Sequence, residues 1–407
     1  MKGRPSRSPW SVRVTGPLAR YVSGFVAELE HQGYAPQSVQ KHLWQMAHLS
    51  RWMQGNAVET SDLTTATVAQ FVRERRAAGY WNLQSERGAR PLMEHLRAIG
   101  VTPMKETTPI TADPVEELLH EFHHYLIAER GLVLGTVRGY ETKVRPLLVA
   151  RAGASRLDLA QLTGADVTRF LLEQSRRQTV ASAKNIVTAL RALLRFLYLE
   201  GKTAVDLGPA VPAVAGWRGG HLPRALPPGE VDRLLASCDR ATQVGRRDFA
   251  ILTLLARLGL RASEVADIEL DDFDWTAGAI VIRGKGNRRE RLPIPVDVGD
   301  AVTAYLLERP HVECRRVFLR SCAPVGAVSG PVVGEVVRRA CERAGVPPVG
   351  AHRLRHTVAT EMLRQGASLP EVAQILRHRT LEATATYAKL DRVALRPLAR
   401  PWPEVWA

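Results

Sequence analysis

Residues 258–270 read LGLRASEVADIEL, and this stretch decides how the C-terminal part of the chain folds. A helix is predicted to end at Gly259 and another to begin directly after Arg261, because glycine often follows the last turn of a helix. Arg261 therefore lies at a corner between two helices, where its planar guanidinium can reach a phosphate. Glu264 is placed to hold that guanidinium. Arg–Glu pairs at this spacing are common on helix surfaces, so the stretch gains meaning only from its neighbours.

A β-hairpin is predicted next. Residues 279–283 and 289–294 are expected to form its two strands, and they flank the turn GKGN at 284–287. The glycines on both sides of Lys285 let the backbone turn and leave the ammonium group free to enter a groove. A primary amine beside a phosphate can donate a proton to a leaving oxygen.

Residues 350–357, GAHRLRHT, open another predicted helix. His352 and Arg355 lie on one face of it, since they are separated by about one turn. His352 and His356 have a spacing that suits zinc, but the neighbouring arginines repel a cation and no third ligand stands nearby. We therefore expect no metal here. An imidazole beside a guanidinium suits a phosphate and a proton transfer.

The last of these segments contains a tyrosine. Ser368 and Glu371 have the spacing of a capping box, and they predict the start of a helix that carries His378 at its end. A short helix of small residues is expected over 381–389 and contains Tyr387. One turn can therefore bring Tyr387 close to His378.

In this order, the strings LGLRASEVADIEL, GKG in a hairpin, HRLRHTVATEML and LRHRTLEATATYAKL resemble the tyrosine recombinase family, the lambda-integrase-like or phage integrase family. The likeness to the catalytic domain of that family covers residues 226–395, and residues 114–205 resemble its helical core-binding domain. One position departs from the family pattern, because Arg377 stands where a glycine usually precedes the late histidine. We expect the Arg377 side chain to contact DNA or to point into solvent, and the departure leaves the geometry of that turn open.

The resemblance implies a site-specific DNA recombinase of the integrase or transposase type, which cleaves and rejoins DNA through a 3′-phosphotyrosyl intermediate and a Holliday junction. The implied roles are Tyr387 as nucleophile, Arg261 and Arg355 as stabilisers of phosphate charge, His352 as acceptor of the tyrosine proton, Lys285 as proton donor to the leaving 5′-oxygen, His378 as a phosphate ligand, and Glu264 as the group that orients Arg261. No cofactor is required. A homotetramer on paired sites in double-stranded DNA is expected, and accessory recombinases are left open as further partners.

The composition agrees with a nucleic-acid partner. The 407-residue chain has a formal net charge of +15 and an isoelectric point near 10.2, which favours a polyanionic ligand. Its four cysteines form no Cys-x-x-Cys pair, so zinc and a disulfide framework are not supported and a reducing cytoplasm is favoured. No apolar run suits a signal core or a membrane span. We expect a cytoplasmic protein that associates with the nucleoid when it is on DNA.

The first half of the chain contains an approximate internal repeat. The segment that starts at Phe25 resembles the one that starts at Phe122, roughly 100 residues later. Each copy is predicted to hold three or four amphipathic helices, with Ser38 and Thr136 as N-caps of the second helix. The pattern favours a duplication of one helical domain over a chance similarity between two four-helix domains.

These observations predict a mainly α fold with a small β-hairpin or sheet. The predicted domains are an extra helical N-terminal domain at 1–106, a helical core-binding (SAM-like) domain at 107–207, a linker at 208–225, and a catalytic domain with a C-terminal tail at 226–407. Leucines and tryptophans separated by prolines in that tail suggest that it docks on a neighbouring subunit.

Other functions compete with this interpretation. A type IB topoisomerase-like enzyme shares the tyrosine and arginine chemistry, but the duplicated helical units look like modules for recognising a DNA site. A catalytically silent DNA-binding regulator is disfavoured by the complete residue set. A helical scaffold would explain the repeat but not the residues from Arg261 to Tyr387.

Overall fold

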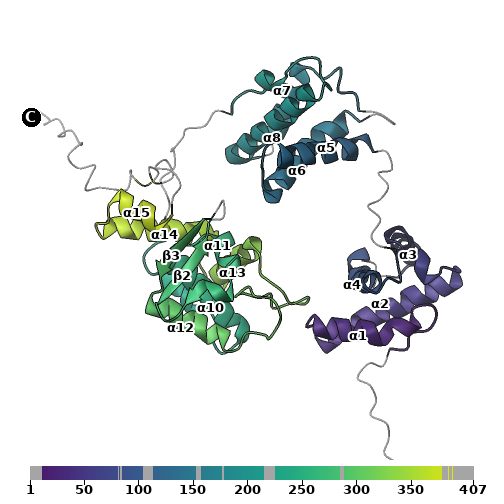
Figure 1. Ribbon diagram of the computed structural model, residues 1–407, viewed down its shortest axis with the longest axis horizontal. Helices are drawn as coiled ribbons and strands as arrows, with labels where there is room; N and C mark the ends of the chain where they lie inside the picture. The colour runs from purple at the N-terminus through teal and green to yellow at the C-terminus, as the bar shows by residue number, and fades with distance from the viewer. Residues whose placement is uncertain are drawn as a thin grey trace, which may run out of the picture. The chain divides into compact units, whose positions relative to one another are not determined.

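The computed structural model describes residues 12–80, 82, 85–103, 113–152, 157–176, 178–214, 225–284 and 288–377, together with Thr384 and Tyr387. The chain divides into two compact units, one of residues 103–218 and one that joins residues 1–102 to residues 219–407. Figure 1 shows the helices and strands in chain order by colour.

The described N-terminal part consists of helices around one apolar core. They are α1 (Val22–His31), α2 (Pro36–Gly55), α3 (Thr65–Ala77) and α4 (Glu86–Ala98), with 3-10 turns at Ala19–Tyr21 and Thr60–Asp62. Phe25, Leu43 and Leu96 are fully buried in that core. The hydroxyl group of Thr64 accepts a hydrogen bond from the backbone N–H of Thr67, so a side-chain cap fixes where α3 begins.

The unit of residues 103–218 has the same order of helices. They are α5 (Pro114–Ala128), α6 (Leu134–Ala150), α7 (Gly164–Ser175) and α8 (Val180–Leu199), with a 3-10 turn at Gly208–Ala210. Phe122 and Phe196 meet in the core with their ring centroids 5.4 Å apart. Thr163 caps α7 in a capping box with Asp166, as Thr64 caps α3.

The predicted N-caps of the second helix in each copy are wrong. Helix α2 begins at Pro36 and helix α6 at Leu134, so Ser38 and Thr136 lie inside the first turn. Proline suits the first position of a helix because its fixed φ is helical and its missing N–H would have no partner there. The same displacement occurs in both copies, and the duplication stays a prediction.

The described C-terminal part combines helices with a small sheet. The helices are α9 (Glu230–Ala236), α10 (Gln243–Leu258), α11 (Ala262–Ala266), α12 (Val296–Leu306), α13 (Gly330–Ala344), α14 (Ala351–Arg364) and α15 (Leu369–Ile375), with a 3-10 turn at Leu270–Asp272. The strands are β1 (Phe273–Asp274), β2 (Ala279–Arg283) and β3 (Arg289–Pro293).

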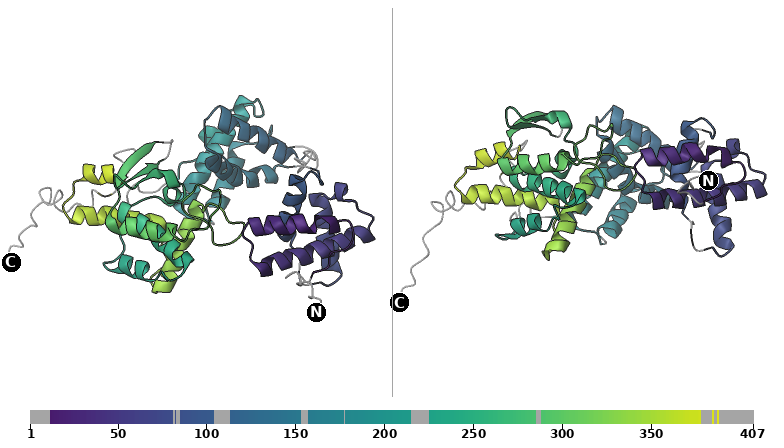
Figure 2. Two further views of the ribbon diagram at one scale, coloured as in Figure 1. Left: turned by 60° about the horizontal axis from the view of Figure 1, so that its bottom comes forward. Right: turned by 90° about the horizontal axis from the view of Figure 1, so that it is seen from below.

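The predicted hairpin is confirmed. Strands β2 and β3 pair antiparallel, with Ile280 opposite Leu292, and β1 adds a third antiparallel strand on the other edge of β2. Figure 2 shows this sheet beside the helices of the C-terminal part, and it also shows α14 and α15 next to each other. The expectation of a mainly α fold with a small sheet is therefore confirmed.

Helix α10 lies at the centre of the C-terminal core. Ile251, Leu254 and Leu255 are fully buried, and the helix packs against α12, α13 and α14. It ends at Gly259, as the sequence predicted, with φ at +56° in the left-handed region that favours glycine. A β-carbon at Gly259 would lie 2.7 Å from Cδ2 of Leu376, so the missing side chain also lets the end of α15 approach the end of α10.

Among the described residues, no helix combines the length and the apolar character that crossing a membrane requires.

A glycine-to-alanine pair separates backbone strain from packing at the end of α10. We expect Gly259→Ala to lower the free energy of unfolding by about 1 kcal/mol from its positive φ, and by more from the clash with Leu376. Gly278→Ala is the matched control, because Gly278 has φ at +57° and a β-carbon added there would meet open space. Equal losses in urea unfolding of the two variants would contradict the close approach at Gly259.

Candidate active site

Several separate elements carry the predicted site residues that the structure describes. Arg261 is the N-cap residue of α11, whereas His352 and Arg355 lie in the first turns of α14. Tyr387 lies beyond the end of α15. Lys285 and His378 fall outside the described residues, and so does the C-terminal tail.

Glu264 holds Arg261 in two ways. The backbone N–H of Arg261 donates to Oε2 of Glu264 at 2.8 Å, and the guanidinium of Arg261 donates to Oε1. The side chain of Glu264 is 3% exposed, whereas that of Arg261 is 38% exposed. The carboxylate therefore fixes the inner end of a guanidinium whose outer part faces solvent, as predicted from the spacing.

The charge of Glu264 is stabilised in spite of its burial. Burial raises the pKa of this carboxyl, but the hydrogen bond from the backbone of Arg261 and the positive charges of Arg377 and Arg261 outweigh that effect and lower it overall. Glu264 is thus a carboxylate at neutral pH, and it attracts the guanidinium groups that face it.

Arg355 is buried and joins the ends of two helices. It is 1% exposed, and it donates Nη1–H to the carbonyl oxygen of Gly259 at 2.6 Å and Nη2–H to that of Leu376. Burial, together with the positive charge of Arg261, lowers the pKa of Arg355 to about 10. Arg355 remains a cation at neutral pH, and a guanidinium with five N–H donors has others left for a phosphate.

His352 lies on the exposed side of the same helix. Partial burial lowers its pKa, and the positive charges of Arg355 and Arg261 act in the same direction. Its ring lies 4.5 Å from that of His356, at an interplanar angle of 74°. The two rings are therefore neighbours, as their spacing on α14 predicted.

His356 is a site residue that the sequence reasoning missed. Its Nδ1 lies 2.6 Å from the hydroxyl oxygen of Tyr387. Burial lowers the pKa of His356 to about 4, and the charges of His352 and Arg355 contribute. The imidazole is therefore neutral at physiological pH and can accept the hydrogen bond of the phenol. Its spacing from His352 was the available signal, but that spacing was weighed only for zinc.

Tyr387 is 2% exposed and packs in a small apolar cluster with Ala359, Val372 and Leu376. Burial raises the pKa of its phenol, and the positive charge of Arg355 opposes this. The neutral phenol is thus favoured where the side chain lies.

The expectation for Arg377 is wrong. Its side chain neither reaches towards DNA nor points into solvent, because it is 4% exposed and pairs with Glu264 at 3.0 Å. The backbone at Arg377 has φ at +55°, so the turn keeps a left-handed conformation that a glycine would adopt at lower cost. The buried carboxylate of Glu264 explains the inward direction, since it attracts a second cation.

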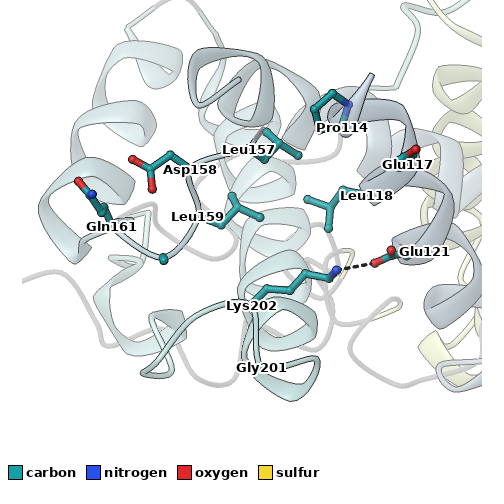
Figure 3. A pocket seen from close by; sticks show the side chains of 11 residues that line it. Pro114, Glu117, Leu118, Glu121, Leu157, Asp158, Leu159, Gln161, Gly201 and Lys202 are labelled. Atoms are coloured by element: carbon teal, nitrogen blue, oxygen red, sulfur yellow. Dashed lines mark ion pairs between the residues drawn. The ribbon is translucent and has the colours of Figure 1, made fainter. Parts of the chain in front are cut away.

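Two other kinds of site are not supported in the part of the chain that the structure describes. No group of three or more His, Cys, Asp or Glu side chains there could hold a metal ion. An open pocket of about 710 Å³ lies in the unit of residues 103–218, and Figure 3 shows Lys202 paired with Glu121 on its wall. Glu117 and Asp158 also line it. Acidic groups outnumber the lysine, so this pocket does not suit a phosphate.

Known structures share this fold at low sequence identity. The XerH site-specific recombinase in a structure bound to palindromic difH substrate has a TM-score of 0.55 at 20% identity, over 85% of this chain and 97% of that one. A lambda integrase dimer on a COC′ core site gives 0.52 at 16% identity, over 72% and 98%. The Tn1549 transposon integrase gives 0.52 at 14% identity, over 69% and 99%.

Curated relatives are more similar in sequence. The protein y4rA of Sinorhizobium fredii, named as an integrase/recombinase, is 40% identical over 392 residues, which are 95% of each chain. Another such protein of that organism, y4rF, is 34% identical over 78% of this chain and 76% of its own. Tyrosine recombinase XerD of Mycobacterium tuberculosis is 32% identical over 71% and 96%. The likeness to y4rA thus includes most of the N-terminal helices.

Two family models match consecutive parts of the chain. The model of the phage integrase N-terminal SAM-like domain matches residues 119–201, and the model of the phage integrase family matches residues 224–393. The second match contains all the elements that carry the described site. The relative y4rA also matches along almost the whole length of this chain. The chain therefore belongs to the phage integrase family of tyrosine recombinases.

Proposed function

We propose that this site-specific recombinase cleaves and rejoins double-stranded DNA through a covalent bond between Tyr387 and a 3′-phosphate. The observation that carries the proposal is the pairing of a buried tyrosine hydroxyl with a neutral histidine, on the same helix as a buried arginine. The relatives named above give no support to a type IB topoisomerase-like enzyme or to a silent regulator.

The chemistry is a phosphoryl transfer in two steps. The Tyr387 oxygen forms a bond to phosphorus while the bond to the 5′-oxygen breaks, and Lys285 gives that oxygen a proton. The freed 5′-hydroxyl of a second strand reverses these steps and restores the phosphodiester, so no ATP is consumed. A Holliday junction is the DNA intermediate between the two rounds of strand exchange.

The proton of Tyr387 needs an acceptor, and we infer that His356 receives it first. The distance of 2.6 Å supports His356 over His352, to which the sequence analysis gave this role. Because the pKa of His356 is lowered to about 4 and that of Tyr387 is raised, complete transfer of the proton before the reaction is strongly unfavourable. The phenol is therefore oriented in the ground state and loses its proton only as the bond to phosphorus forms.

Arg261 and Arg355 supply the electrostatic part of the mechanism. Negative charge that grows on the non-bridging oxygens is stabilised by charge-assisted hydrogen bonds from both guanidinium groups, which the protein holds in place beforehand. His352 and His378 would add hydrogen bonds to the same phosphate. Glu264 acts through Arg261 and does not touch the substrate.

The assembly is inferred from the requirement that two duplexes exchange strands. A homotetramer on paired sites places four active sites on two DNA duplexes, and the C-terminal tail would dock on a neighbouring subunit. The same proposal places the protein in the cytoplasm, associated with the nucleoid when it is on DNA, and it leaves accessory recombinases open as further partners.

The nucleophile is tested by trapping. A duplex selected from a random-sequence pool by binding to the full-length protein is nicked so that the cleaved product cannot religate, and it is incubated with protein in EDTA without ATP. We expect a protein–DNA adduct on a denaturing gel for the wild type and none for Tyr387→Phe. Tyr305→Phe is the matched control, because Tyr305 is also buried and hydrogen-bonded. An adduct with Tyr387→Phe would exclude this nucleophile.

A change of the leaving group distinguishes the proton-transfer role of Lys285 from that of His356. With ordinary DNA we expect Lys285→Ala and His356→Phe each to lower the single-turnover cleavage rate by about 10²- to 10⁴-fold. A 5′-bridging sulfur leaves as a thiolate and needs no proton, so it should restore cleavage by Lys285→Ala but not by His356→Phe. Restoration of both variants, or of neither, would contradict the assignment.

A further inference from the structure

Arg377 occupies a position that is unfavourable for it on two counts. Its φ of +55° lies in the region that side chains with a β-carbon rarely adopt. Its guanidinium is 4% exposed, and a buried cation is costly unless it is paired. A glycine would avoid both costs, so the arginine must gain something from its surroundings.

Arg377 gains an ion pair with the carboxylate of Glu264. Nη2 of Arg377 donates to Oε2 of Glu264 at 3.0 Å, and Nη1 donates to the carbonyl oxygen of Ile375 at 3.1 Å. Its Nε is buried without a hydrogen-bond partner in the described structure. The side chain is therefore held mainly by one ion pair, in which both partners are almost completely buried.

The same carboxylate already holds Arg261. Oε2 of Glu264 accepts from the backbone N–H of Arg261 as well as from Arg377, and Oε1 accepts from the guanidinium of Arg261. The residue before Arg377 is Leu376, whose carbonyl oxygen accepts from Arg355. The turn at 376–377 thus contacts Arg355 directly and is linked to Arg261 through Glu264.

We propose that Arg377 is a positioning residue for strand cleavage, which acts through Glu264 to fix Arg261 and through the turn at 376–377 to fix Arg355. This inference rests on the proposed function. It does not require Arg377 to touch DNA, and it differs from a purely stabilising role because the rate of cleavage, and not only the stability, depends on the pair.

The ion pair between Arg377 and Glu264 predicts a specific pH dependence of the cleavage rate. The charged groups that face Glu264 are Arg261 at the start of α11, Arg355 on α14 and Arg377 after α15. Removal of the Arg377 charge leaves burial less opposed, so the pKa of Glu264 rises. Glu264 then becomes neutral at a higher pH as the solution is acidified, and a neutral carboxyl no longer anchors Arg261.

The test compares Arg377→Gly, Arg377→Lys, Glu264→Gln and the double variant of glycine and glutamine. Arg377→Gly suits the left-handed backbone, and it removes the ion pair together with the hydrogen bond to Ile375. In single-turnover cleavage of the nicked duplex with saturating full-length protein, we expect Arg377→Gly to be about tenfold slower than the wild type near neutral pH. The acidic limb of its pH–rate profile should move to higher pH. Arg377→Lys should recover part of the wild-type cleavage rate.

The double variant decides whether Arg377 acts through Glu264. We expect Arg377→Gly to cause no further loss of rate and no shift of the acidic limb in the Glu264→Gln background. Wild-type rates for Arg377→Gly across the pH range, with or without a lower melting temperature, would overturn the proposal. Additive losses in the double variant would overturn it as well.

A measurement without DNA keeps this inference distinct from the proposed function. Glu264 has a lowered pKa in the folded chain, so it stabilises the fold above its ordinary range and loses that contribution as the pH falls. Arg377→Gly should therefore lower the melting temperature relative to the wild type more at neutral pH than at about pH 4. This difference should vanish in the Glu264→Gln background. No adduct with the wild type would refute only the proposed function, whereas a pH-independent decrease would refute the ion pair.

Discussion

The ion pairs of the buried Glu264 carboxylate are the interactions on which the rest of the candidate active site depends. Arg261 and Arg377 pair with this carboxylate. Arg355 lies close enough for its positive charge to be repelled by those of Arg261 and Arg377. One anion among these cations leaves an excess of positive charge in a region with little water, where electrostatic forces are strong. A phosphate that enters would remove this excess. Part of its binding energy therefore comes from repulsion that is already present.

The fold supplies the short distances that this charge arrangement needs. The end of α10, the start of α11 and the end of α15 meet because Gly259 has no side chain to hold Leu376 away. Arg355 then ties two backbone carbonyl groups together, one from each of these ends. Packing and polar bonds thus act on the same few residues, so a change in the apolar contact would also move the charged groups.

Local patterns in the sequence predicted what local physics determines. The helix end at Gly259, the strands around the turn at 284–287 and the capping box of Ser368 were all predictable from residue type and spacing. The direction of Arg377 was not, because it depends on a carboxylate more than one hundred residues away in the sequence. The contact of His356 with Tyr387 was hidden for the same reason, since Tyr387 lies on another segment.

The inward arginine at 377 also limits how the chain can diverge or be redesigned. With glycine at this position, the residues around Glu264 would face one cation fewer, and with arginine but without the carboxylate, a buried charge would remain unpaired. Only the second combination is penalised, so we expect an arginine at 377 to require the carboxylate at 264. A chimera assembled from two relatives should keep both segments from the same parent.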